Sequence, residues 1–381
     1  MEEKTKKKII PQEELYSYAK LKSKDMQSTR SALYYTGIIL LNIFFLALAW
    51  VLVGNKDGVV GFNQVVTAVD WKNILFIFLI VALILIIQVF PDYMFYYSKT
   101  KKRKFGTLFL ANAKMNFYNS VTLFSSGGYY MFANRLVDDG ATSQSALDTA
   151  YFKKFISKIS QIVYSFLAII VGAILFLSKT NIWLIIGGII GFSINCIAVV
   201  FVLIFDTHRD KVLSCVAGLC KTLYRLKFIK DYEDFYNRLV SKLFVYNSNL
   251  KFAKKSTIIH ILLNVLIQFL RHFVLFIILQ MLNFGDLEVL LEILFKCAII
   301  DLIIGVLPLQ NGTAIFELLF VSLFNNVFFS GYLLWGMVLY RFFDYFIYLI
   351  IYLFVLPFDS KKRKSDTNTL KNTHTTQTLS K

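Results

Sequence analysis

The stretch LFKCAIIDLIIGVLPLQNGTAIFELLF, residues 294–320, begins and ends as an apolar helix and is interrupted between Pro308 and Gly312. Each half is shorter than the roughly 20 apolar residues that a bilayer-spanning helix needs. A break at membrane depth leaves backbone groups unpaired unless protein or a watery cavity covers them. Asp301 and Glu317 flank the break, and intramembrane carboxylates mark functional sites. The stretch is therefore predicted to be a re-entrant hairpin lining a polar cavity.

The composition indicates a membrane protein. Hydrophobic residues make up 57% of the 381 residues, whereas soluble domains are about 45–50% apolar. The net charge is +17, and most Lys and Arg residues lie outside the apolar segments. Membrane topology and an anionic lipid surface explain this charge better than nucleic acid, for which no zinc-finger or RNA-binding motif is present.

The sequence carries no pattern typical of catalysis or of metal binding. It has no nucleophile–base pair, HExxH motif or P-loop. Its four cysteines form no CxxC pair, so neither a zinc site nor a disulfide framework is indicated. No catalytic residue, metal ligand or cofactor is therefore predicted.

Six apolar runs are long enough to cross a bilayer. They are residues 31–53, 72–97, 155–177, 182–205, 258–282 and 332–356. Residues 1–30 are predicted to be a basic cytoplasmic N-terminus, residues 31–358 the transmembrane domain, and residues 359–381 a disordered cytoplasmic tail. Inside the domain, residues 206–257 combine many Lys and Arg residues with apolar residues at helical spacing. They are predicted to form two interfacial amphipathic helices on the cytoplasmic side.

Residues 105–136 form a second interrupted apolar segment. Asn112, Asn116 and Asn119 are three or four residues apart and so share one helix face. The segment breaks at residues 125–128, where two glycines permit backbone geometries that are closed to other residues. An amphipathic surface helix followed by a loop is one interpretation. A second re-entrant hairpin is favoured, because basic residues flank both ends of the segment.

The positions of the basic segments predict the orientation. Cytoplasmic loops carry an excess of Lys and Arg, which puts the N-terminus, residues 99–104, 151–158 and 206–257, and the tail inside the cell. The two hairpins then enter from opposite sides, each between two spans. Inverted repeats with paired broken helices are typical of secondary transporters, although the same topology rule could produce this symmetry by coincidence. The predicted fold is an all-α polytopic integral membrane protein of the cell membrane, with six full spans and two re-entrant broken-helix hairpins in an inverted repeat.

Three short motifs stand in order along residues 30–356. They are Ser126-Gly127-Gly128 followed by Arg135 and Asp139-Gly140, Leu307-Pro308 through Gly312 followed by Glu317, and Leu339-Tyr340-Arg341. Together they resemble the membrane region of the bacterial lysyl-phosphatidylglycerol synthases, also called the multiple peptide resistance factor family. Gln310 and Asn311 stand where that family has glycines. In the family, a soluble C-terminal domain transfers lysine from its tRNA to phosphatidylglycerol, and the membrane region is assigned the outward flipping of the product.

The resemblance implies a flippase that moves an aminoacylated phospholipid with a charged headgroup between leaflets. Two alternatives remain open. One is the membrane part of a phosphatidylglycerol lysyltransferase, with a separate soluble aminoacyltransferase as its catalytic partner. The other is a transporter of polyprenyl-linked glycolipids. The expected partners are membrane phospholipid and an anionic lipid surface, with homo-oligomerisation left open and no direct contact to nucleic acid.

Ten residues are candidates for contact with the lipid headgroup. They are Asn112, Asn116, Asn119, Ser126, Arg135, Asp301, Gly312, Glu317, Arg341 and Asp344. The arginines would bind a lipid phosphate bidentately. The carboxylates would meet a cationic aminoacyl group or hold the arginines in place, and the asparagines would form a polar track.

The ionisable residues at membrane depth are Asp301, Glu317, Arg341, Asp344, Arg271 and, on one interpretation, Arg135. Alternative roles are open for several of these and for two histidines. Arg341 and Asp344 are three residues apart and could instead pair with each other. Because residues 325–331 form a short connection, Arg341 and Glu317 are predicted to lie on neighbouring helices and to share one cavity. His260 and His272 are isolated on apolar helices and are interpreted as polar packing partners.

Overall fold

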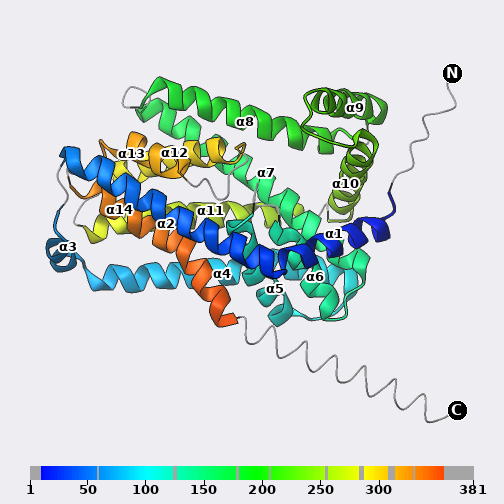
Figure 1. Ribbon diagram of the computed structural model, residues 1–381, viewed down its shortest axis with the longest axis horizontal. Helices are drawn as coiled ribbons and strands as arrows, with labels where there is room; N and C mark the ends of the chain where they lie inside the picture. The colour runs from blue at the N-terminus through cyan, green and yellow to red at the C-terminus, as the bar shows by residue number, and fades with distance from the viewer. Residues whose placement is uncertain are drawn as a thin grey trace, which may run out of the picture.

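The protein is a bundle of helices (Figure 1). The computed structural model describes residues 10–57, 60–122, 127–176, 180–205, 207–253, 256–282, 287–307, 314–328 and 331–355, and none of these residues forms a strand. The helices are α1 (Gln12–Met26), α2 (Thr29–Asp57), α3 (Phe62–Ala68), α4 (Trp71–Thr100), α5 (Phe105–Ser120), α6 (Gly127–Asp138), α7 (Ser143–Phe176), α8 (Ile182–Leu203), α9 (Arg209–Arg225), α10 (Tyr232–Phe252), α11 (Thr257–Met281), α12 (Leu287–Ile304), α13 (Ile315–Phe324) and α14 (Leu333–Arg341), followed by the π-helix η3 (Phe342–Phe346).

Six of the described helices are long and apolar enough to cross a membrane. They lie at Thr29–Val51 in α2, Trp71–Thr100 in α4, Ser143–Phe176 in α7, Ile182–Leu203 in α8, Thr257–Met281 in α11, and Leu333–Val355, which starts as α14 and continues through η3. The chain is therefore an all-α multi-pass membrane protein. The predicted six spans are confirmed.

The third span, predicted at residues 155–177, is part of a longer helix, because α7 begins at Ser143. With 34 residues, α7 is about 51 Å long at 1.5 Å per residue, whereas the hydrocarbon core of a bilayer is about 30 Å thick. The added N-terminal turns carry polar side chains such as Asp148 and Thr149, which are buried against neighbouring helices, among them α1, α6 and α10. Protein packing, which hydropathy does not measure, extends this helix.

Both interrupted segments form a pair of short helices. α5 packs against α6 and α12 packs against α13. In Figure 1, α5 and α6 lie towards the end of the bundle that holds α1, α9 and α10, whereas α12 and α13 lie towards the opposite end, near α3. Each pair stands between two spans, α4 and α7 in one case and α11 and α14 in the other. The predicted break residues Ser126 and Gly312 lie outside the described residues.

Two glycines allow helices to approach closely. A Cβ atom on Gly128 at the start of α6 would lie 2.2 Å from the backbone oxygen of Met115 on α5. A Cβ atom on Gly191 of α8 would lie 2.4 Å from the backbone oxygen of Leu302 on α12. Both distances are far below van der Waals contact, so a larger residue at either position would push the helices apart.

The N-terminal segment contains a helix, α1, that was not predicted. α1 buries Leu15, Tyr16 and Ala19 and packs against α6, α7 and α10. The two helices predicted in residues 206–257 are present as α9 and α10. α10 packs against α7 as well as against α9, so it forms part of the bundle.

Candidate functional site

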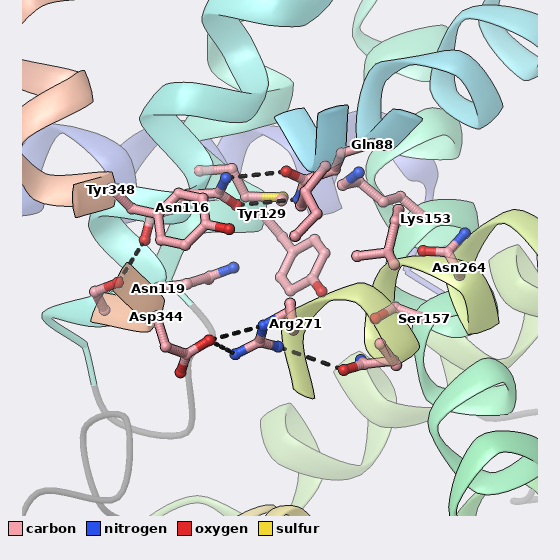
Figure 2. A pocket seen from close by; sticks show the side chains of 15 residues that line it. Gln88, Asn116, Asn119, Tyr129, Lys153, Ser157, Asn264, Arg271, Asp344 and Tyr348 are labelled. Carbon is pink, nitrogen blue, oxygen red and sulfur yellow. Dashed lines mark hydrogen bonds and ion pairs between the residues drawn. The ribbon is translucent and has the colours of Figure 1, made fainter. Parts of the chain in front are cut away.

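A polar cavity lies between α4, α5, α6, α7, α11 and the last span (Figure 2). Its volume is about 220 Å³, several times the ~30 Å³ that one water molecule takes up in the liquid. Its polar lining consists of Gln88, Asn116, Asn119, Ser120, Tyr129, Lys153, Ser157, Asn264, Gln268, Arg271, Asp344 and Tyr348. The lining residues come from segments far apart in the sequence, so the fold brings together polar groups that are costly at membrane depth unless they pair or face water.

An ion pair occupies one wall of the cavity. Nε and Nη2 of Arg271 donate to the same oxygen, Oδ1 of Asp344, at 2.9 and 2.7 Å. Nη1 of Arg271 donates to Oε1 of Gln268 at 3.4 Å. The side chains of Arg271 and Asp344 are 30% and 11% exposed, so the pair remains open on the cavity side. Figure 2 shows both side chains at the edge of this space.

Asp344 lies on the π-helix η3, which interrupts the last span directly after Arg341. π-helical turns are rare and occur frequently at functional sites. The wider turn also changes which residues share a helix face. The alternative that Arg341 and Asp344 pair with each other is wrong, because each side chain bonds a different helix.

Amide side chains form the opposite part of the cavity. Gln88 of α4 and Asn116 of α5 exchange two hydrogen bonds of 3.1 and 3.0 Å. Asn119 accepts a hydrogen bond of 3.0 Å from the backbone N–H of Gly128 and so fixes the first turn of α6. Asn116 and Asn119, predicted as parts of a polar track, both line the cavity.

Asn112, the third predicted asparagine, lies behind the cavity wall and is buried. Its Nδ2 donates to Oδ2 of Asp92 at 2.7 Å, and Nζ of Lys153 bonds the same oxygen at 2.8 Å. Asp92 therefore holds Lys153, which lines the cavity. Asp92 was not among the candidate residues, although an acid inside the predicted span 72–97 was a signal that could have found it.

Glu317 and Arg341 lie on neighbouring helices, as predicted, and bond each other. Nε of Arg341 donates to Oε1 of Glu317 at 2.9 Å, and the side chains are 2% and 3% exposed. The guanidinium also stacks over the ring of Phe316, 3.9 Å from its centroid. Neither residue lines the polar cavity. The pair is closed within the apolar core around α13 and α14.

A third polar group lies between α7, α11 and α12. Nε2 of His272 and Oδ2 of Asp301 are 3.2 Å apart, and Nδ1 of His272 is 2.7 Å from the hydroxyl of Tyr164. His272 is 2% exposed, whereas the Asp301 side chain is 29% exposed. His272 thus has a carboxylate on one side and a hydroxyl on the other. Arg135 is buried on α6 and does not line the polar cavity.

Of the polar α11 residues that line the cavity, Arg271 was predicted to lie at membrane depth, but Asn264 and Gln268 were not among the candidates. Asn264, Gln268 and Arg271 are four and three residues apart, so they share one face of α11. Three polar residues at helical spacing inside an apolar span indicate a polar helix face, which could have been predicted from the sequence. Their opposite face carries Leu262, Val265, Leu266 and Phe269, which line an apolar groove of about 400 Å³ between α7, α11 and α12.

Comparisons of the chain with family models, with curated proteins and with solved structures find no match. Among the residues that the structure describes, no group of three His, Cys, Asp or Glu side chains could hold a metal ion. The fold and the site define the class: a multi-pass α-helical membrane protein with a charged, amide-rich cavity within its bundle.

Proposed function

We propose that this protein moves a phospholipid with a charged headgroup between the two leaflets of the cell membrane. The observation that carries the proposal is the polar cavity around Arg271 and Asp344. Arg271 lies near the middle of the span Thr257–Met281, and Asp344 lies near the middle of Leu333–Val355. Charged groups near the middle of spans are costly unless they pair or face water, and they mark pathways through the membrane.

The cavity offers a complementary group for each part of a phospholipid headgroup. Arg271 and Lys153 supply N–H donors for a phosphate, which arginine binds through its planar fork. Asp344 supplies an acceptor for an amine. An aminoacylated phosphatidylglycerol carries both a phosphate and an amine, and it is the substrate that we propose. The headgroup would displace part of the existing Arg271–Asp344 pairing when it binds.

A second candidate substrate is a polyprenyl-linked glycolipid. Five amide side chains line the cavity: Gln88, Asn116, Asn119, Asn264 and Gln268. Amides donate and accept hydrogen bonds at once, which suits the many hydroxyl groups of a sugar. Such a lipid also has a phosphate for Arg271 and Lys153, but it has no amine for Asp344.

The proposal is tested by lipid movement in liposomes that contain the purified full-length protein. The probes are lysyl-phosphatidylglycerol, phosphatidylglycerol and a polyprenyl-phosphate sugar, each made accessible to an impermeant reagent only in the outer leaflet. We expect the aminoacylated lipid to cross fastest. Arg271→Gln and Asp344→Asn are each expected to slow its movement at least tenfold.

A matched control uses the pair Asp234–Arg238, which lies on α10 away from the cavity and has the same carboxylate–guanidinium chemistry. Asp234→Asn is expected to leave lipid movement unchanged. A wild-type protein that moves none of the three lipids would contradict the proposal. Preferential movement of the sugar lipid, with Asp344→Asn active, would support the second candidate instead.

The proposed orientation has both termini in the cytoplasm, with α3 outside and α9 and α10 inside. It follows from the basic residues of the N-terminus and of residues 206–257. Single cysteines are placed at the exposed positions Asn63 on α3 and Lys230 before α10, in a chain without its native cysteines. In intact cells the cysteine at position 63 should react with an impermeant thiol reagent, and the one at position 230 should not. The reverse pattern would overturn the orientation.

A further inference from the structure

The hydrogen-bonded series Tyr164–His272–Asp301 crosses the interface of three helices. Tyr164 lies on α7, His272 on α11 and Asp301 on α12, the first helix of a broken pair. The two contacts, 2.7 and 3.2 Å, use both ring nitrogens of the imidazole. One end of the series is open, because the Asp301 side chain is 29% exposed. At the other end, Tyr164 borders the apolar groove.

We propose that His272 and Asp301 form a protonation site that couples lipid movement to a proton gradient. The inference rests on the proposed transport function and adds its energy source. Among side chains, histidine is the one whose unperturbed titration lies between about pH 5 and 8. An imidazole that is buried beside a carboxylate, with water access through that carboxylate, can take up and release one proton in each cycle.

The neutral and the protonated forms of His272 differ in the strength of the contact between α11 and α12. In the neutral imidazole, Nε2–H donates to Asp301 and Nδ1 accepts from the Tyr164 hydroxyl. When a proton from water is added, Nδ1–H donates to the Tyr164 oxygen, and the bond to the Asp301 carboxylate becomes an ion pair between two opposite charges. Away from bulk water, the attraction between opposite charges adds to the hydrogen bond. Protonation therefore tightens α12 against α11, and release of the proton to water on the other side loosens it.

The surrounding charges place this site next to the cavity. The charged and titratable groups around it are Lys158 and Tyr164 of α7, Arg271 of α11, Cys297 and Asp301 of α12, and Tyr340 and Asp344 of the last span. Helix α4 also packs against α11, and its Asp92 forms an ion pair with Lys153. Arg271 adjoins His272 in the chain and pairs with Asp344 in the cavity. A movement of α11 against α12 therefore reaches the headgroup site directly.

The experiment uses the full-length protein in liposomes with the membrane potential held at zero by potassium and valinomycin. A difference of one pH unit is set across the membrane, and the leaflet distribution of lysyl-phosphatidylglycerol is measured at steady state. One proton coupled to each lipid shifts the leaflet ratio about tenfold per pH unit. We expect this shift for the wild type. His272→Asn and Asp301→Asn are expected to reach the same ratio with and without the gradient.

His260→Asn is the matched control. His260 lies on the same helix, is fully buried, and neither of its ring nitrogens makes a hydrogen bond to the described residues. This variant should respond to the gradient as the wild type does. If the wild type moves lipid but its leaflet ratio ignores the gradient, the protonation site is overturned while the transport function stands. A gradient response retained in both His272→Asn and Asp301→Asn would overturn it as well.

A second measurement does not depend on transport. With ¹⁵N-labelled histidine in detergent-solubilised protein, the signal lost in His272→Asn should change with pH in the wild type. Asp301→Asn should abolish or displace this change, because the carboxylate that stabilises the imidazolium is gone. A His272 signal that does not change with pH would overturn the protonation site. If no lipid moves in any liposome, the transport function fails, and the energy source proposed for it fails with it.

Discussion

The two broken-helix pairs use their polar residues in opposite ways. In α5–α6, Asn116, Asn119 and Tyr129 face a cavity of about 220 Å³. In α13, Glu317 is closed against Arg341, with both side chains at most 3% exposed. The α5–α6 groups remain available at the cavity, whereas Glu317 is held in an ion pair inside the protein. A polar residue at membrane depth thus identifies a substrate site only when a cavity reaches it, because a second polar residue can satisfy it equally well.

The largest expected effect comes from breaking the closed pair. Glu317→Gln or Arg341→Gln leaves one buried charge without its counter-charge, which costs about 3–5 kcal/mol. The double variant should recover most of this loss, because no uncompensated charge remains. The measurement is the free energy of unfolding of the detergent-solubilised protein. If the double variant is as unstable as the single ones, Glu317 and Arg341 do not act as a closed structural pair.

The exposed pair on α10 sets the scale for that experiment. Asp234 and Arg238 are 2.8 Å apart, close to the 2.9 Å of the buried pair, but their side chains are 48% and 26% exposed. Surface pairs one helical turn apart contribute about 0.3–0.5 kcal/mol. Asp234→Asn should therefore change the free energy of unfolding by less than about 1 kcal/mol. The two experiments thus compare a buried and an exposed carboxylate–guanidinium pair at similar distances.

The next largest effect is expected from a substitution in the helix pair α5–α6, which faces the cavity. Gly128→Ala would place a Cβ atom 2.2 Å from the Met115 oxygen and force α6 away from α5. Overpacking of this kind costs about 1–3 kcal/mol. It should also slow lipid movement, because Asn119, which bonds the Gly128 amide, lines the cavity. Both quantities are measured on the purified protein.

Gly106→Ala on the same α5–α6 pair provides the control, because nothing lies within 4 Å of the added Cβ atom. In a helix, alanine is favoured over glycine by about 1 kcal/mol, so this variant should be no less stable than the wild type. If Gly128→Ala behaves like Gly106→Ala, the close contact between α5 and α6 does not shape the cavity.

The spans were predictable because hydropathy and length alone define them. Residues 182–205 were predicted and Ile182–Leu203 are observed. The helix α1 was not predictable in this way, and neither was the continuity of α7 from Ser143 into the span. Both depend on tertiary contacts: polar residues such as Asp148 and Ser23 are buried by neighbouring helices. No pattern in the local sequence indicates which helices will pack against these residues.

The candidate site was predictable in kind but less so in place. Asn116, Asn119 and Asp344 were expected at the cavity and line it. Arg341 and Glu317 were expected there as well, but they form a hydrogen-bonded ion pair with each other outside the cavity. The sequence alone could not distinguish a charged residue at a cavity from one in a buried ion pair, because the difference depends on which residues lie beside it in space. The π-helix at Phe342–Phe346 added to the difficulty, since residue spacing on an α-helix does not apply across it.

The smallest expected effect tests whether the cavity is open to water. Gln88 and Asn116 exchange two hydrogen bonds across the cavity wall. Water in the cavity can replace either amide, so the coupling energy between Gln88→Ala and Asn116→Ala should be near the lower end of the usual range, about 0.5–1 kcal/mol. A double-mutant cycle on the free energy of unfolding measures it. Lipid selectivity should change more than stability, because a headgroup competes for the same donors. A coupling above about 2 kcal/mol would show that these amides are closed off like Glu317 and Arg341, and the contrast between the two broken-helix pairs would fail.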